Sequence, residues 1–139
     1  MAINKKIADL NEMFSVFDNP IDKYSQLIEL GKNNSGISTP YKNESNRISG
    51  CASMAWIITR KKNNQYYISI DSDTFIVRGL LNILKIIIDG EKKDDIFQLK
   101  IENILKNIGM EESITSQRTN GFISALDKIK KQIEKINGK

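Results

Sequence analysis

The chain has 139 residues, of which 40% are hydrophobic and 27% charged, as expected of one globular domain over residues 1–139. Its net charge is +4, but its lysines are scattered, concentrate only near the C-terminus and form no basic stripe interleaved with aromatic residues, so we expect no nucleic-acid partner. The single cysteine excludes an internal disulfide, and the absence of histidine excludes Ser-His-Asp and Cys-His catalysis. Zinc sites built on histidine and iron–sulfur clusters held by several thiolates are excluded as well, so we expect no metal and no cofactor.

The N-terminal third of the sequence predicts two helices and a loop. Apolar residues recur every three or four positions in the first helix, which predicts an amphipathic helix carrying Ile3, Ile7, Leu10, Phe14 and Phe17. A second helix is expected to begin at Pro20 and to stop at Gly31. Residues 32–46 are polar and are predicted to form a loop.

Residues 47–71 are predicted to form a small antiparallel meander of about three strands. The run from Trp56 to Thr59 is β-branched and aromatic, and we expect Trp56 in the core. Residues 61–64 are typical of a hairpin connection, and beyond them apolar and polar side chains alternate up to Ile70.

The remainder of the sequence predicts helices. Residues 71–74 offer several N-caps for a helix that is apolar around most of its circumference and is expected at the centre of the fold. A helical stretch follows from about Asp94 to Ile108, with room for a break near Lys100. Thr115 or Ser116 caps a last helix. The predicted fold is α+β, in the order αα–βββ–ααα, with helices packed on one face of the sheet.

Membrane insertion and export are not expected. The most apolar segment, Gly79 to Ile88, is interrupted by Asn82 and Lys85 and is too short to span a bilayer. The N-terminal segment is amphipathic and lacks the apolar stretch of a signal peptide. We therefore expect a cytoplasmic protein.

Cys51 is the candidate for chemistry, and its surroundings leave two interpretations open. Gly50, Ala52 and Ser53 are small and would leave a thiol accessible to another protein's sulfur, while backbone N–H groups of the turn could stabilise a thiolate. The alternative is a tight hairpin in which an inert cysteine packs against its neighbours, as lone cysteines often do.

Three segments carry a resemblance to the SufE family. Residues 48–56 (ISGCASMAW) resemble its V/I-x-G-C-x-S-x-V-W motif. Residues 71–80 (DSDTFIVRGL) resemble D-S-D-A-x-I-V-x-G-L, and residues 114–122 (ITSQRTNGF) resemble L-T/S-P-x-R-x-N/Q-G-L. The sequence departs from these motifs at Ala52, Met54, Ala55 and Ser116, and Ala52 removes a polar neighbour of the thiol.

The resemblance implies a fold shared with the IscU-type scaffold proteins and a role in sulfur transfer. Cys51 would accept sulfur from the persulfide of a SufS-type, pyridoxal-phosphate-dependent cysteine desulfurase, stimulate that enzyme, and pass the sulfur to the Suf scaffold for iron–sulfur cluster assembly. Two alternatives remain: a CsdE-type acceptor that serves another desulfurase and pathway, and a non-catalytic desulfurase-binding module with an inert cysteine. A monomer and a homodimer are both compatible with the sequence.

Other residues of the three motifs are candidates for supporting roles. Arg118 either stabilises the thiolate or persulfide or forms a structural ion pair, with Asp73 as the suggested partner; both can hold if the pair positions the loop. Asp71 and Asp73 are interpreted first as helix caps. The loop residues Gly50 and Ser53, together with Asn120 and Gly121, complete the candidate site, with Gly121 expected to allow close helix packing.

Overall fold

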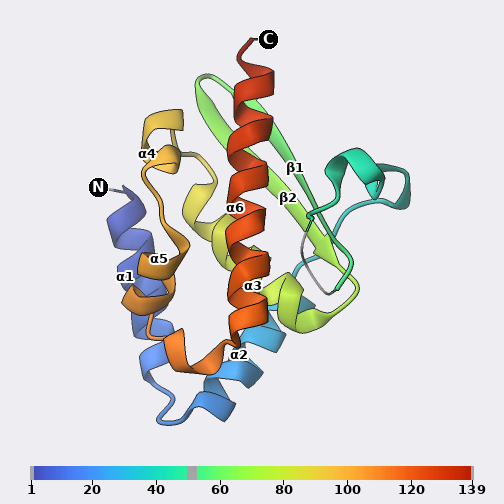
Figure 1. Ribbon diagram of the computed structural model, residues 1–139. Coiled ribbons are helices and arrows are strands. Elements are labelled where there is room, and N and C mark those ends of the chain that lie inside the picture. Colours follow the sequence, from blue (N-terminus) through green and yellow to red (C-terminus); the bar gives the residue numbers. More distant parts are fainter. Residues whose placement is uncertain (1, 50–52, 139) are drawn as a thin grey trace.

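The computed structural model describes residues 2–49 and 53–138 and shows an α+β fold (Figure 1). Two helices precede a two-stranded antiparallel sheet, and four helices follow it. The longest helix, α6, runs along the length of the molecule, with the strands on one side of it and α1, α4 and α5 on the other (Figure 1). The elements in chain order are α1 (Ala2–Ser15), α2 (Pro20–Lys32), β1 (Ala55–Lys62), β2 (Gln65–Ser72), α3 (Phe75–Ile88), α4 (Lys93–Phe97), α5 (Ile101–Asn107) and α6 (Ser116–Ile136).

The predicted α+β class is confirmed, but the sheet has two strands in the described part of the chain, where about three were predicted. The segment expected to form the first strand contributes only an isolated bridge between Arg47 and Trp56. The short 3-10 helix Glu44–Asn46 immediately precedes this bridge. The region predicted as one helix from Asp94 to Ile108 forms α4 and α5, with the break at Lys100 that the sequence allowed.

The sheet is a hairpin that buries one face against two helices. Asn63 and Asn64 both have positive φ, which is the turn geometry that matches the twist of two antiparallel strands. Ile57 pairs with Ile70, and both are buried on the face that packs against α3 and α6. Trp56 is also buried, as predicted, but on the opposite face of β1, because successive side chains of a strand alternate between its faces.

Helix α3 lies at the centre of the fold, as its sequence predicted. Ile83, Leu84, Ile87 and Ile88 are completely buried, and α3 contacts β2, α1, α2 and α6. Gly90, at a φ of 86°, follows the C-cap residue Asp89 and reverses the chain. No helix among the described residues is both long enough and apolar enough to cross a membrane.

Helices α2 and α3 cross at two glycines. A Cβ atom on Gly31 would lie 2.0 Å from the carbonyl oxygen of Phe75, and one on Gly79 would lie 2.0 Å from that of Leu27. The prediction that Gly31 stops the second helix is therefore wrong: α2 continues to Lys32, and Gly31 serves the close approach of two backbones. This crossing fixes where the chain leaves α2.

We expect Gly79→Ala to destabilise the protein by about 3 kcal/mol, because the added methyl group overlaps a backbone atom that cannot move independently of its helix. Urea unfolding followed by circular dichroism measures the change. Helix propensity alone predicts a gain of about 1 kcal/mol for the same substitution, so a stabilised variant would contradict the crossing geometry. Gly90→Ala is the control: no atom lies within 4 Å of its Cβ position, and it should cost only about 1 kcal/mol for its left-handed backbone.

Candidate functional site

The segment that carries Cys51 leaves the described structure at Ser49 and returns at Ser53. Cys51 itself, with Gly50 and Ala52, lies outside the described residues, so the predictions for Cys51 and Gly50 remain predictions. The two ends of the segment are held together. The backbone N–H of Ile48 donates to the carbonyl oxygen of Ala55 at 2.9 Å, next to the bridge between Arg47 and Trp56.

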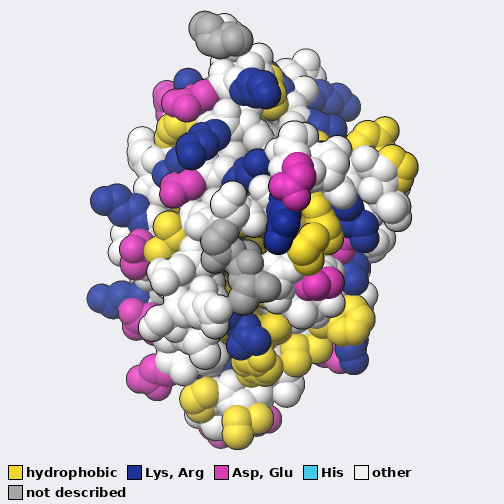
Figure 2. Space-filling model, turned by 45° about the vertical axis from the view of Figure 1, so that its right-hand side comes forward, with side chains coloured by type: hydrophobic (Ala, Val, Ile, Leu, Met, Phe, Trp, Pro, Cys, Tyr) yellow, Lys and Arg dark blue, Asp and Glu magenta, His cyan; other side chains and the backbone are white. Residues whose placement is uncertain are grey.

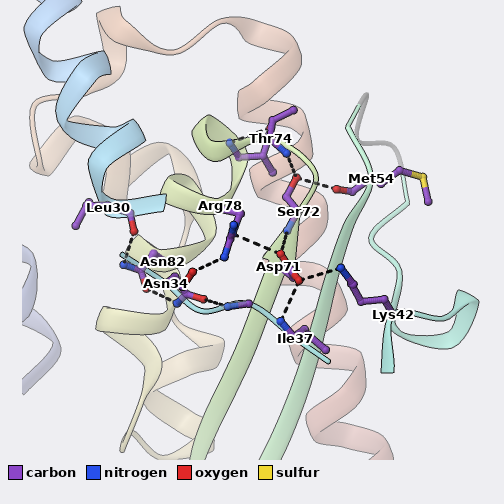
Figure 3. A network of polar contacts seen from close by, with 12 residues as sticks. Leu30, Asn34, Ile37, Lys42, Met54, Asp71, Ser72, Thr74, Arg78 and Asn82 are labelled. Atoms are coloured by element: carbon purple, nitrogen blue, oxygen red, sulfur yellow. Dashed lines mark hydrogen bonds and ion pairs between the residues drawn. The ribbon is translucent and has the colours of Figure 1, made fainter. Parts of the chain in front are cut away.

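The returning end is attached to the junction between β2 and α3. The carbonyl oxygen of Met54 accepts a hydrogen bond from the Ser72 hydroxyl at 2.7 Å (Figure 3). It also accepts one from the backbone N–H of Asp73 at 3.1 Å. The hydroxyl of Thr74 lies 3.5 Å from that of Ser53. Residues 72–74 of the second motif therefore hold Ser53 and Met54. These two residues, together with Ile48 and Ser49 at the other end of the segment, are called the loop base below.

Asp71 has a different role from the helix cap that was predicted. Thr74 caps α3, because its hydroxyl accepts from the backbone N–H of Val77 at 3.4 Å. The Asp71 side chain is only 9% exposed, and its two oxygens accept from the backbone N–H groups of Ile37 at 2.9 Å and Ser72 at 2.7 Å. Asp73 is exposed, and it contributes its backbone N–H to the loop base.

Two cations neutralise the Asp71 carboxylate. Arg78 Nε lies 3.4 Å from Oδ1, and Lys42 Nζ lies 3.4 Å from Oδ2 (Figure 3). The Lys42 ammonium group also lies 5.2 Å from the centre of the Trp56 ring. The carboxylate thus joins β2, α3 and the segment that follows α2.

Arg78 extends this network to the C-terminal end of α2. Its guanidinium donates to the carbonyl oxygen of Asn34, whose side-chain amide donates to Asn82 Oδ1 at 3.0 Å. Gly36 passes so close to Asp71 that a Cβ atom would lie 2.7 Å from Oδ2, and its φ of 82° also favours glycine. Sequence reasoning missed Arg78 and Lys42. The available signal was the position of Arg78 inside the same motif as Asp71.

Arg118 lies beside the loop base but not against Asp73. It is half-buried in the first turn of α6, where its backbone N–H donates to the predicted cap Thr115 at 3.3 Å. Its guanidinium lies 5.6 Å from the centre of the Tyr24 ring, and within the described residues it forms no ion pair. The Asp–Arg pair near the loop is formed instead by Asp71 and Arg78.

The third motif is divided between two faces of α6. Arg118 and Gly121 line a cavity of about 10 Å³ together with Ile48, which leads into the Cys51 segment. Gly121 is buried there, whereas Asn120 is exposed and lines a separate hollow beside Glu102 and Glu111. The structure therefore brings Ser53, Arg118 and Gly121 to the loop base and leaves Asn120 away from it.

The surface around the loop base also carries apolar side chains. Met54 is 38% exposed and Phe75 is 46% exposed. Lys32 and Arg78 lie 5.8 Å and 5.6 Å from the centre of the Phe75 ring. Exposed apolar residues rimmed by cations are typical of surfaces that contact other proteins.

The fold is that of a small α+β protein, in which the end of the segment that carries the cysteine is held at the junction of the hairpin and the central helix α3. The family model described as "SufE: Fe-S metabolism associated domain" matches residues 8–133. The chain therefore belongs to the SufE family, and a sulfur-transfer role in iron–sulfur metabolism is what this membership implies.

Individual relatives agree with the family match. An uncharacterized SufE-like protein of Rhizobium meliloti (strain 1021) is 33% identical over 125 residues, covering 87% of this chain and 89% of that protein. SufE-like protein 1, chloroplastic/mitochondrial, of Arabidopsis thaliana is 26% identical over 129 residues, covering 91% of this chain but 34% of that protein. A solution structure of a hypothetical protein from Thermus thermophilus has the same fold, with a TM-score of 0.75, 17% identity and 94% of each chain covered.

We expect Asp71→Asn to lower the free energy of unfolding by about 2 kcal/mol, because the amide places an NH₂ group against donors and leaves Arg78 and Lys42 without a counter-charge. Urea unfolding measures the loss. Asp73→Asn is the matched control and should change stability by less than about 0.5 kcal/mol, since Asp73 is exposed. Equal losses in the two variants would show that Asp71 is not the residue that joins these elements.

Proposed function

We propose that this protein accepts a sulfur atom on Cys51 from a SufS-type cysteine desulfurase, stimulates that enzyme, and hands the sulfur on for iron–sulfur cluster assembly in the cytoplasm. The observation that carries the proposal is the family match over residues 8–133, which includes the only cysteine of the chain. The hydrogen bonds of Ile48 and Met54 support it, because they fix the described residues on both sides of Cys51 to the rest of the fold.

The proposed transfer is a thiol–disulfide type of exchange. The Cys51 thiolate attacks the outer sulfur of the desulfurase persulfide, and a new S–S bond forms as the donor's S–S bond breaks. The donor cysteine leaves as a thiolate, and the transferred sulfur keeps its proton, giving Cys51–S–SH. The exchange conserves charge and needs no external oxidant or reductant.

The chain has no histidine to act as a general base, so the thiolate must be stabilised by other groups. Arg118 is the proposed cation from within the chain. It lines the same small cavity as Ile48, and within the described residues no carboxylate neutralises it. An arginine in the first turn of a helix is disfavoured by the helix dipole, which is consistent with a use outside α6.

We expect the protein to gain one sulfur atom when it is incubated with cysteine and a SufS-type desulfurase. Intact mass spectrometry under non-reducing conditions measures the gain, and reduction should reverse it. Cys51→Ser should gain nothing and should also fail to stimulate the desulfurase. An unchanged mass of the wild-type protein beside an active desulfurase would exclude the carrier role. If Cys51→Ser still stimulates the enzyme, the protein is a binding module with an inert cysteine.

We expect Arg118→Ala to slow sulfur transfer at saturating desulfurase by about tenfold. This is the effect expected from removing one charge-assisted contact to the reacting sulfur. Arg118→Lys should recover part of the rate because it keeps the charge. Tyr24→Leu removes the ring that the guanidinium contacts, and it reports how much of the effect comes from that contact. If Arg118→Ala and Tyr24→Leu lower thermal stability equally and leave the saturated transfer rate unchanged, Arg118 is a structural residue.

A further inference from the structure

A groove runs along α6 on the side where Ser45 and Ser49 lie. Its volume is about 380 Å³. One wall is formed by Ser45 and Ser49, and the other by side chains of α6, namely Ser124, Asp127, Lys128, Lys131, Gln132 and Lys135. Ser49 stands two positions before Cys51, which corresponds to about 7 Å of extended chain. Ser49, in the groove wall, is therefore within about 7 Å of chain of the proposed acceptor.

Three lysines give the groove its charge. Lys128, Lys131 and Lys135 have helical spacing and form a stripe about 10 Å long. Of the described residues that line the groove, Asp127 alone is acidic. Among the described residues, none of the three lysines pairs with a carboxylate, whereas Lys5, Lys6 and Lys42 do. Lys and Arg side chains also predominate over the upper part of this face, where the C-terminal half of α6 lies (Figure 2).

We propose that this groove receives an acidic surface segment of the protein that donates sulfur to Cys51. The inference rests on the proposed function and adds the place and the charge of the contact. A donor whose sulfur reaches Cys51 must lie over the adjoining end of the groove, and unpaired lysines there attract a negatively charged surface. None of the described residues lining the groove is aromatic and able to stack on bases, which disfavours single-stranded nucleic acid as the occupant.

Charge reversal in the groove tests this proposal. Lys128→Glu, Lys131→Glu and Lys135→Glu are combined, and sulfur loading of Cys51 is followed by mass as the SufS-type desulfurase is titrated. We expect the desulfurase concentration for half-maximal loading to rise at least about tenfold while the rate at saturation stays unchanged. The wild-type value should rise with added NaCl, and the variant should lose that dependence. The triple variant with Gln at the same three positions should have a half-saturating concentration between those of the wild-type protein and the Glu variant. It also shows whether the effect of the Glu variant comes from charge and not from misfolding.

The matched control carries the same change of charge elsewhere. Lys92, Lys100 and Lys106 are exposed and lie outside the groove, and their combined replacement by Glu should leave half-saturation within about twofold of the wild-type value. An equal rise in the control and groove variants would overturn the proposal in favour of overall charge. Normal half-saturation in the groove variant, with Cys51 still loaded, would overturn it while leaving the sulfur-acceptor role intact.

A second readout separates the donor from the next acceptor. Loaded wild-type and groove-variant proteins are compared for release of sulfur to the acceptor that follows them. We expect equal release. If loading is normal and release alone is impaired, the groove serves the acceptor, and the proposed contact with the donor is wrong. If the wild-type protein never gains sulfur, both the inference and the function on which it rests fail.

Discussion

The buried carboxylate of Asp71 is the interaction on which the arrangement of the site depends. It lies at the end of β2 and reaches the N–H of Ile37, the ammonium of Lys42 and the guanidinium of Arg78. Because a buried carboxylate is stable only when its charge is compensated and its oxygens are hydrogen-bonded, these partners are required together. Asp71 therefore fixes the chain after α2 to the same junction that holds the carbonyl of Met54 through Ser72 and Asp73.

The glycine crossing makes this junction possible. With the backbones of α2 and α3 in contact at Gly31 and Gly79, the chain leaving α2 passes directly over the first turns of α3. Asn34 then lies within reach of both Arg78 and Asn82. A larger separation of the two helices would remove these short contacts. The close packing of the two helices and the polar network therefore depend on each other, and together they determine where the loop base lies.

The sequence predicted what is determined locally. The hairpin connection, the buried α3 and the cap Thr115 follow from side-chain periodicity and turn chemistry, which act over a few residues. The roles of Asp71 and Gly31 could not be found this way. Asp71 bonds to Ile37 across 34 positions, and Gly31 meets Phe75 on another helix, so neither contact leaves a local pattern. The expected third strand is represented among the described residues by a single bridge, which pairs Arg47 with Trp56 directly after a short 3-10 helix.

Helix α6 supplies positive charge at two distances from the loop. Arg118 lies near its N-terminal end beside Ile48, and the lysine stripe begins about ten residues later, about 15 Å along the helix axis, beside Ser49. In the proposed function Arg118 acts at short range on the reacting sulfur, and as a half-buried charge it is screened less than an exposed one. The lysine stripe, in which Lys131 and Lys135 are exposed and Lys128 is half-buried, is proposed to act at longer range on an approaching protein, where salt screens it. On the two proposals, bond exchange and docking use different residues of the same helix, and for that reason the saturated rate and the half-saturating concentration should respond to different substitutions.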